Sequence, residues 1–270
     1  MPCFFVVLYP KQQERSLGYT FFEKFRHHSE VRHCITQRDF RKPLEGSLAL
    51  HTGQDATQVR VNRAELTEYF GKEAPFVSAL QVHGNRVHVV RETVHRGWHT
   101  LDPDLKADAM VTDLPGVVLT ILTADCVPIL LYDPIHQAIG AVHAGWRGTQ
   151  QEISRKTIET ISRLYGTRAA DLIVGIGPAI GGCCYEVGEE VADHFTDYPE
   201  ALSQKGNGKY LLDTKQVNAQ QLIDLGIPEA QIEISPVCTM CEHERFFSYR
   251  AERGTAGRFM SCIALTKDNV

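Results

Sequence analysis

The sequence has no long apolar run and no strongly basic stretch, and each of these absences excludes a class of protein. It also has no internal repeat and no low-complexity segment. No segment approaches the roughly 20 consecutive apolar residues of a transmembrane helix, so we expect no membrane span. The net charge is −5 and the isoelectric point is near 6.2. Without a cluster of Lys and Arg, the sequence predicts neither a nucleic-acid partner nor attraction to an anionic membrane surface.

The first residues are not expected to be a secretion signal. Residues 1–10 (MPCFFVVLYP) contain a short apolar run with no basic segment before it and Lys11 after it, so we expect a strand there. Eight cysteines without such a signal predict reduced thiols and a cytoplasmic protein. Some of these cysteines are expected to be metal ligands, and several are expected to be small buried hydrophobic side chains.

The residues that are present are typical of a globular α/β protein. Hydrophobic residues make up 43% of the 270 residues, which is enough for one large domain or two small ones. Apolar runs predict strands at 33–38, 47–53, 76–83, 86–92, 117–126, 129–133, 138–145, 171–178, 231–239, 246–250 and 258–265. Helices are predicted after Asp55, from Gln150 to Gly166, after Gly188, and from Asp213 to Leu225. Several neighbouring strands are joined by turns too short for parallel crossovers, so we expect mixed sheets covered by helices.

Three residues that commonly bind metals stand at the ends of predicted strands. They are His83 in QVHG, Cys126 in TADC and His143 in VHAGWRG. Two imidazoles and one thiolate suit a catalytic zinc ion, which keeps the fourth position for water, and the same set also suits copper. Alternatively, Cys126 is a buried core thiol and both histidines are structural.

Arg147 lies between Gly145 and Gly148, just before the predicted helix from Gln150. Glycines allow close approach to the backbone, a helix N-terminus favours anions, and the guanidinium suits phosphate. This pattern predicts an anion site. The alternative is a glycine turn with a solvated arginine.

A second glycine-rich stretch, 175–188 (GIGPAIGGCCYEVG), lacks the spacing and context of a dinucleotide-binding loop, and we interpret it as a turn that lines the substrate. In an extended chain Cys183 and Cys184 point to opposite sides, so we do not expect them to share one metal. Cys238 and Cys241 have C-x-x-C spacing, which is typical of zinc or redox sites. No second C-x-x-C accompanies them, so we expect this pair to be structural or incidental.

Taken together, these motifs resemble the YfiH/YlmD-type laccase-domain family, which is also called the multicopper polyphenol oxidase family. The resemblance runs in consistent order from the segment at 33–38 to the C-terminus, and the TADC and HAGWRG segments are its most specific parts. It is carried by QVHGNRV, ADAMVTD, LTADCVPILLYDP, AVHAGWRGT, GIGPAIGGCCYEVG, CTMC and FFSYR.

The resemblance implies a fold, a metal site and an activity. The fold would be a single α/β domain over 1–270, an α-β-β-α sandwich of mixed sheets layered with helices, similar to cysteine hydrolase-like proteins. The metal ligands would be His83, Cys126 and His143, holding zinc or, alternatively, copper. The activity would be phosphorolysis of adenosine, inosine and S-methyl-5′-thioadenosine, together with deamination of adenosine. The partners would be purine nucleosides and phosphate, and the chain would be a monomer or a homodimer.

Candidate roles follow for a zinc-dependent purine nucleoside enzyme. In phosphorolysis an arginine would hold phosphate for attack at the ribose C1′, with Arg147 as first choice and Arg63 as second. Arg250, in FFSYR, is a further substrate-binding candidate. Asp125 and Asp108 are candidates for acid–base catalysis or for orienting the metal ligands. A turn or helix-capping role for both aspartates is the alternative.

Three other functions stay open. A copper-dependent phenol oxidase (laccase) would use the same His/Cys site, although none of the 12 histidines forms the H-x-H pairs of conventional multicopper clusters. A cysteine hydrolase would use Cys126 as nucleophile and His143 as base. A zinc-stabilised binding domain would have no catalytic activity.

Overall fold

Two large β-sheets lie face to face at the centre of the computed structural model, which describes residues 18–254 and 257–267. The five-stranded sheet has the order β1 (Tyr19–Thr20), β2 (Val31–Thr36), β14 (Phe259–Leu265), β6 (Val118–Thr123) and β3 (Phe76–Ser78). The six-stranded sheet has the order β13 (Ile232–Ile234), β9 (Ile173–Ile176), β7 (Val127–Asp133), β8 (Ala138–Ala144), β5 (Ala109–Thr112) and β4 (Val87–Val89). Both sheets contain parallel and antiparallel pairs, as expected from the short connections.

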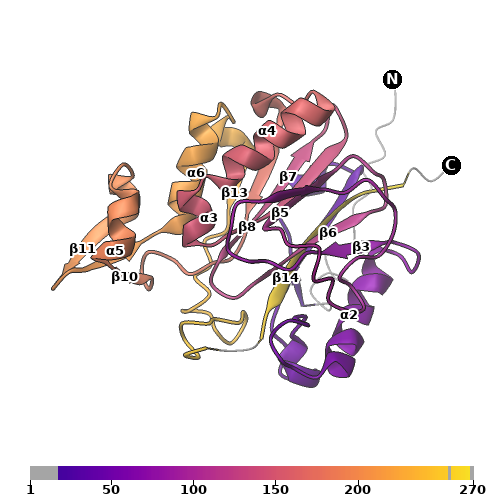
Figure 1. The fold of residues 1–270 in the computed structure, drawn as a ribbon, viewed down its shortest axis with the longest axis horizontal. Coiled ribbons are helices and arrows are strands. Elements are labelled where there is room, and N and C mark those ends of the chain that lie inside the picture. Colours follow the sequence, from indigo (N-terminus) through magenta and orange to yellow (C-terminus); the bar gives the residue numbers. More distant parts are fainter. Residues whose placement is uncertain (1–17, 255–256, 268–270) are drawn as a thin grey trace.

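Helices cover both outer faces of the stacked sheets (Figure 1). The helices are α2 (Ala56–Phe70), α3 (Trp146–Gln150), α4 (Ile153–Tyr165), α5 (Glu189–Ala192) and α6 (Thr214–Asp224). Short 3-10 turns occupy Phe25–His27, Pro43–Gly46, Ala169–Asp171, Asp193–Phe195, Pro199–Ala201 and Glu229–Gln231. Helices α4 and α6 pack on the six-stranded sheet and α2 packs on the five-stranded sheet. The layers are therefore α-β-β-α, which confirms the expected fold class.

Strands β7 and β8 are buried at every position. One face of their sheet contacts the other sheet and the opposite face contacts α4, so both faces need apolar side chains. This double burial explains why the sequence of these strands reads as nearly continuous apolar runs. It also places the residues at their ends at the rim of a rigid core.

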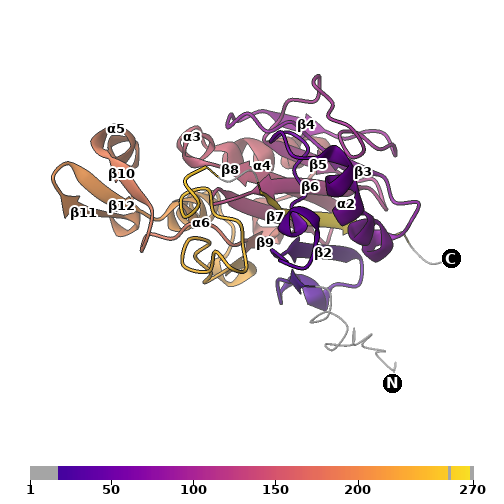
Figure 2. The same cartoon turned by 90° about the horizontal axis from the view of Figure 1, so that it is seen from below.

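A small third sheet projects from the body (Figures 1 and 2). It consists of β10 (Glu186–Gly188), β12 (Lys209–Leu212) and β11 (Leu202–Gly206) in that order, with α5 beside it. Its own apolar cluster includes Val187, Phe195 and Leu212, and Trp146 of α3 packs against that cluster. The projecting sheet is therefore joined to the body next to the HAGWRG segment.

The predicted helix signals agree with the structure. The Asp55 carboxylate accepts a hydrogen bond from the Thr57 amide at the start of α2, and Gly166 adopts a left-handed conformation with φ of 79° after α4. The Asp213 carboxylate accepts bonds from the Lys215 and Gln216 amides and so begins α6. These signals depend only on local chain chemistry, which is why sequence locates them well.

Some predicted elements are wrong, and one cannot be compared. Residues 47–53 and 246–250 form no strand, and the strand expected over 76–83 ends at Ser78. The helix expected from Gln150 begins later, at Ile153 of α4, because Glu152 adopts a left-handed conformation with φ of 53° and separates α4 from the short helix α3. The strand expected over 1–10 lies outside the described residues. Among the described helices, none has the length and apolar character needed to cross a membrane.

Candidate metal centre

The three expected metal ligands converge, and we call His83, Cys126 and His143 the triad. Their potential ligand atoms all lie within 4.8 Å of one another. The Cys126 Sγ is 3.8 Å from His83 Nε2, and the two imidazole rings are 4.8 Å apart between centroids. This spacing suits three ligands that surround one ion, so the donor set fits a zinc or copper ion.

The sheet and two turns bring the triad together. His143 lies in β8 opposite Pro128 of β7, so the antiparallel β7–β8 pair places it beside Cys126, which directly precedes β7. His83 comes from the segment between β3 and β4 and has a φ of 59°. Asp125, directly before Cys126, has a φ of 88°. Non-glycine residues rarely adopt such conformations, and their occurrence beside two potential ligands is typical of a functional site.

The Asp108 carboxylate supports the triad from behind. It is fully buried, and its Oδ1 lies 2.8 Å from His143 Nδ1. The same carboxylate accepts hydrogen bonds from the amides of Val82, His83 and Gly84 at 2.8 to 3.2 Å. Asp108 therefore stabilises the left-handed turn at His83. It also keeps a proton on His143 Nδ1, which leaves His143 Nε2 free to bind a metal.

Glycine is required where the backbone passes the triad. A Cβ added at Gly145 would lie 3.0 Å from His83 Cδ2 and 3.2 Å from Cys126 Sγ. Both approaches are tighter than ordinary contacts, so a side chain at this position would displace two ligands. The glycine before Trp146 therefore has a steric role in the centre.

Charge interactions within the triad favour a thiolate. Burial alone would raise the pKa of the Cys126 thiol, but the charge of His143 and hydrogen bonds from both histidines lower it to about 6. Burial would lower the pKa of His143, but Cys126 and Asp108 raise it to about 9. A thiolate beside a cationic imidazole is ready to exchange the imidazole proton for a metal ion.

The triad is open on one side. His143 is only 3% exposed, Cys126 is half-buried and His83 is exposed. A structural metal site normally has four protein ligands, whereas a catalytic site has three and an accessible position. The triad has the second arrangement.

The two aspartates expected in acid–base roles have structural partners. Asp108 has the positioning role already described. Asp125 accepts a hydrogen bond from the Thr239 hydroxyl at 2.6 Å and another from the Arg250 amide at 2.7 Å, one on each carboxylate oxygen. Asp125 therefore ties the turn before Cys126 to two later segments of the chain, and these bonds favour the orienting alternative over proton transfer.

Two of the three expected arginines lie near the triad. Arg147 is exposed and its guanidinium lies 4.2 Å from the centroid of the Trp146 ring. Arg250 is exposed, donates to the Glu186 carbonyl at 2.9 Å and lies 5.2 Å from the centroid of the Tyr185 ring.

Tyr185 links these arginines to the triad. Burial raises the pKa of its phenol to about 12. The charges of Cys126 and Asp125 also raise this pKa, and those of Arg250 and Arg147 lower it. These groups therefore share one rim, and the rim contains two exposed cations.

Arg63 does not fit a substrate-binding role. It is 2% exposed, its Nε and Nη2 donate to the Leu48 carbonyl, and its Nη1 donates to the carbonyls of Gly97 and Trp98. The guanidinium also lies over the Trp98 ring. Because its nitrogens already bond to backbone carbonyls in the interior, Arg63 joins α2 to two loops, and the expectation that it holds phosphate is corrected.

Sequence reasoning missed several residues of this neighbourhood. The His51 ring lies near several positive charges: partial burial of the ring, followed by the charges of Arg258, Arg63, His143 and His83, lowers its pKa to about 4. The apolar pattern of its segment predicts a strand, and no sequence signal there points to the triad. Tyr185 lies within the glycine-rich stretch that was expected to line the substrate, and that stretch was the available signal.

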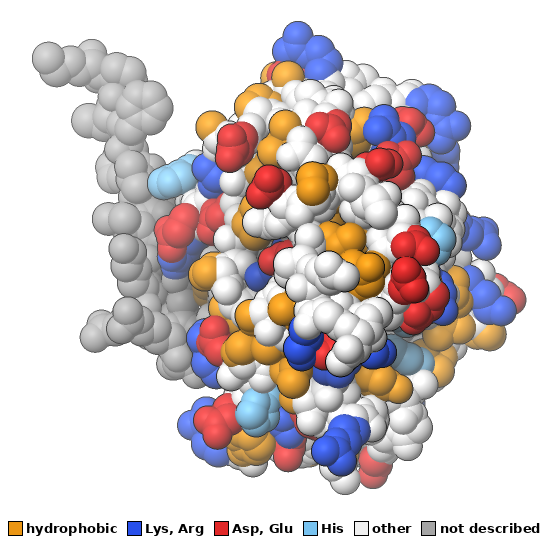
Figure 3. All heavy atoms as spheres, turned by 90° about the vertical axis from the view of Figure 1, so that its left-hand side faces the viewer, with side chains coloured by type: hydrophobic (Ala, Val, Ile, Leu, Met, Phe, Trp, Pro, Cys, Tyr) orange, Lys and Arg blue, Asp and Glu red, His pale blue; other side chains and the backbone are white. Residues whose placement is uncertain are grey.

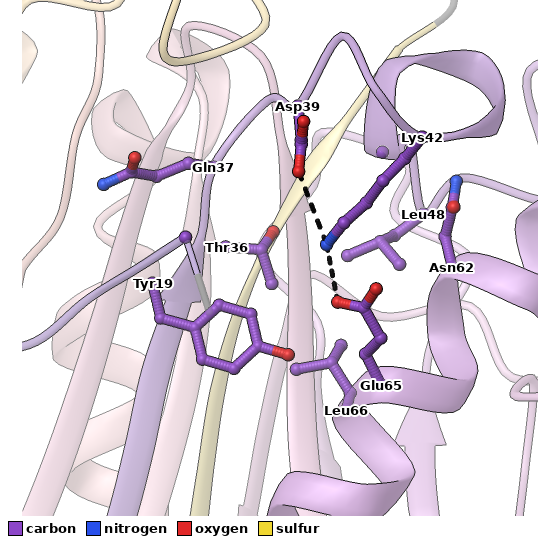
Figure 4. A pocket seen from close by; sticks show the side chains of 11 residues that line it. Tyr19, Thr36, Gln37, Asp39, Lys42, Leu48, Asn62, Glu65 and Leu66 are labelled. Carbon is purple, nitrogen blue, oxygen red and sulfur yellow. Dashed lines mark hydrogen bonds and ion pairs between the residues drawn. The ribbon is translucent and has the colours of Figure 1, made fainter. Parts of the chain in front are cut away.

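A separate pocket lies between the end of β2 and α2 (Figure 4). Lys42 reaches across it, with its Nζ 2.5 Å from Glu65 and 4.0 Å from Asp39. None of the triad residues lines this pocket. Its cation is already paired with two carboxylates, so we place the functional site at the triad.

The face that carries the projecting sheet shows charged side chains of both signs scattered among apolar ones (Figure 3). No single patch of positive charge dominates that view.

Comparison with known proteins adds a family. Residues 32–266 match the family model described as multi-copper polyphenol oxidoreductase laccase. A purine nucleoside phosphorylase of Bacteroides thetaiotaomicron is 33% identical over 95% of this chain and 98% of its own length. Adenosine deaminase RL5, from an unknown prokaryotic organism, is 34% identical over 84% of this chain and 90% of its own length. The crystal structure of the Bacillus licheniformis hypothetical protein YfiH is similar with a TM-score of 0.86, at 34% identity over 94% of this chain and 98% of that chain.

Proposed function

The chain belongs to the multi-copper polyphenol oxidoreductase laccase family, and from that premise we propose that it is a zinc-dependent purine nucleoside enzyme. Its reactions would be phosphorolysis of adenosine, inosine and S-methyl-5′-thioadenosine, together with deamination of adenosine. The names of the similar phosphorylase and deaminase support this substrate class. The observation that carries the proposal is the open triad beside two exposed arginines.

The triad residues would hold the zinc ion through His83 Nε2, Cys126 Sγ and His143 Nε2. When bound, zinc supplies Lewis acidity, which favours the deprotonation of water near neutral pH. Asp108 would keep the proton on His143 Nδ1 throughout and so preserve the direction of Nε2. Gly145 would leave the space that the ligand side chains need.

In phosphorolysis, Arg147 and Arg250 would bind phosphate at the rim and orient one of its oxygens toward the ribose C1′. The new C1′–O bond forms as the bond between C1′ and the purine nitrogen breaks, and a proton from dihydrogen phosphate passes to the purine. The products are the free base and ribose 1-phosphate, or 5-methylthioribose 1-phosphate from S-methyl-5′-thioadenosine. In deamination, water adds at C6 of adenosine and ammonia leaves, which yields inosine. Only the first reaction uses the two arginines for phosphate.

The test is metal removal followed by reloading. Protein stripped with a chelator should lose both reactions, and zinc should restore them. Purine release should depend on phosphate, whereas ammonia release should not. Purine release without phosphate, or full activity in metal-free protein, would contradict the proposal.

A cysteine hydrolase is the second candidate, because Cys126, His143 and Asp108 also form a thiol–imidazole–carboxylate series. With a pKa of about 6, the Cys126 thiol of metal-free protein should be largely ionised at pH 7. We expect iodoacetamide to alkylate Cys126 with a rate that rises through pH 6 and levels above pH 7. Zinc should block this alkylation; if the rate is the same with zinc, the thiol does not bind the metal and the hydrolase gains support.

Copper chemistry can be tested in the same preparation. Within the parts of the chain that the structure describes, the triad is the only potential metal group that contains histidine, so the ligands of a multicopper cluster are missing there. Copper binds such N/S sites more tightly than zinc, and copper loading should raise phenol oxidation in vitro. Strong phenol oxidation by protein that contains zinc alone would show that the triad has been misassigned.

A further inference from the structure

Four cysteines outside the triad lie together at the base of the projecting sheet. We call Cys183, Cys184, Cys238 and Cys241 the four-cysteine cluster, and their sulfur atoms all lie within 4.8 Å of one another. The chain at Cys183 and Cys184 is a turn and not extended, so the reason for not expecting them to share one metal does not hold. Cys238 and Cys241, which were expected to be structural or incidental, lie beside them.

Backbone geometry explains why adjacent cysteines face the same way. Residues 182–184 form a turn rather than an extended strand, and the amides of Cys184 and Tyr185 both donate to the Gly181 carbonyl at 2.9 Å. In a turn, consecutive side chains need not alternate between two sides. The Sγ atoms of Cys183 and Cys184 are consequently 3.6 Å apart.

A second loop brings the C-x-x-C pair to this turn. Cys238 forms an isolated parallel bridge with Ala179, and the Thr239 amide donates to the Ala179 carbonyl at 3.0 Å. Cys241 Sγ then lies 3.8 Å from Cys183 Sγ and 3.4 Å from Cys184 Sγ. The contacts join residues that are 57 and 58 positions apart in the chain.

These distances match the edges of a tetrahedron around one metal ion. With zinc–sulfur bonds of about 2.3 Å, neighbouring sulfurs of a tetrahedral site are roughly 3.8 Å apart. The three sulfur–sulfur distances above lie between 3.4 and 3.8 Å. All four cysteines are free thiols in the structure, so each sulfur is available to bind a metal ion.

The surroundings compensate the negative charge that four thiolates carry. Four thiolates and one divalent ion have a net charge of about −2. The Gly181 amide donates to Cys238 Sγ at 3.3 Å. The buried Lys215 ammonium, which donates to the carbonyls of Ser235 and Val237 at 2.9 Å, interacts with the charges of Cys238 and Cys183.

We propose that the four-cysteine cluster binds one zinc ion as a closed structural site, separate from the triad. Soft thiolates select zinc among the divalent ions available to such a site, and four protein ligands leave no position for substrate. This inference does not rest on the proposed nucleoside activity. It would hold even if the triad had another function.

The zinc would hold together the turn at Cys183 and the C-x-x-C loop, and both segments continue to the neighbourhood of the triad. Thr239, within the C-x-x-C segment, donates to Asp125 beside Cys126, and Tyr185 directly follows Cys184. The closed site would therefore stabilise the rim of the open one without contacting substrate. Its loss should loosen both loops.

The test starts from full-length protein purified under reducing conditions without added metal. The double variant His83→Ala with Cys126→Ala removes two triad ligands and leaves all four cluster cysteines in place. We expect zinc to fall from about two ions to one per chain. X-ray absorption at the zinc edge should show four sulfur neighbours at about 2.3 Å and no nitrogen shell.

A second pair of variants tests the cluster directly. Cys238→Ser with Cys241→Ser should remove one zinc and leave the triad ion, whereas Cys262→Ala, a fully buried thiol of β14, should keep both. The X-ray absorption measurement uses the triad double variant, so it remains informative even if the cysteine-to-serine variants do not fold. Absence of metal in the triad double variant, fewer than four sulfur neighbours, iron in place of zinc, or disulfides among the four cysteines would overturn the proposal.

Discussion

The triad and the four-cysteine cluster are two groups of potential metal ligands that differ in composition and openness. The triad has two imidazoles and one thiol, and His83 leaves it exposed on one side. The cluster has four thiols and no imidazole. Three mixed ligands leave a coordination position for chemistry, whereas four thiolates fill it. The difference fits the proposed catalytic role of the triad and the proposed structural role of the cluster.

The two groups also differ in what surrounds them. The triad stands beside Arg147 and Arg250 and is oriented by the buried carboxylate of Asp108. The cluster is held by backbone amides and by the cation of Lys215. An acidic residue behind a histidine raises its basicity as a ligand, whereas amides and a cation stabilise thiolates. Each environment therefore suits its own ligand set.

The largest expected effect comes from Cys126→Ala. This change removes the single thiolate of the triad, so both nucleoside reactions should fall to the uncatalysed background. Measurement of kcat/KM together with zinc content would show loss at the triad and retention at the cluster. Activity that survives with the triad empty of metal would break the assignment of catalysis to the triad.

Arg147→Ala should separate the two reactions. Loss of a charge-assisted contact to phosphate costs about 2–3 kcal/mol, so phosphorolysis should fall roughly 30- to 150-fold. Deamination should change little, because it needs no phosphate. Arg168→Ala, another exposed arginine, which pairs with Asp171, serves as control. An equal fall in both reactions with zinc still bound would contradict phosphate binding by Arg147 and leave Arg250 as the proposed phosphate residue.

Asp108→Asn should weaken zinc binding at the triad. The amide cannot replace a carboxylate that accepts from His143 and three backbone amides, and such changes typically cost about 10- to 100-fold in metal affinity or activity. Competition with a chromophoric chelator measures the affinity.

The matched control is Asp133→Asn at the opposite end of β7. Asp133 is also fully buried and lies 2.8 Å from His136 Nδ1, yet it does not contact the triad. It should cost folding stability without changing zinc affinity. If both variants lower zinc affinity equally, the effect of Asp108 is general destabilisation.

Thr239→Val should have the smallest effect. It removes the hydroxyl that donates to Asp125 and so uncouples the cluster loop from the turn before Cys126. A loss of ~1 kcal/mol, roughly fivefold in kcat/KM, is expected. Thr120→Val, in the buried β6 strand, removes a comparable hydroxyl that donates to the Val77 carbonyl, and it should leave kcat/KM unchanged. Equal activity in the two variants would show that the loops are not coupled through Thr239.

Sequence patterns predicted the fold class and the three triad residues, but not the partners of the charged candidates. Arg63 has the same charge as Arg147 and lies in an amphipathic-looking helical segment, yet it is buried while Arg147 is exposed. Asp108 directly precedes β5 after a long segment without helix or strand, and only the antiparallel pairing of β5 with β8 places it behind His143. Burial of a charged residue depends on distant backbone carbonyls, which local patterns do not contain.

The sequence by itself determined the features that depend on near neighbours: helix caps at Asp55 and Asp213, the apolar strands β7 and β8, and which thiol and imidazoles are potential metal ligands. Only the tertiary structure decided which ligands meet. His83 reaches Cys126 across 43 positions through a left-handed turn, and the turn at Cys183 faces a loop 58 positions later. Side-chain chemistry is a property of single residues, whereas convergence depends on strand order and on backbone dihedral angles that distant contacts stabilise.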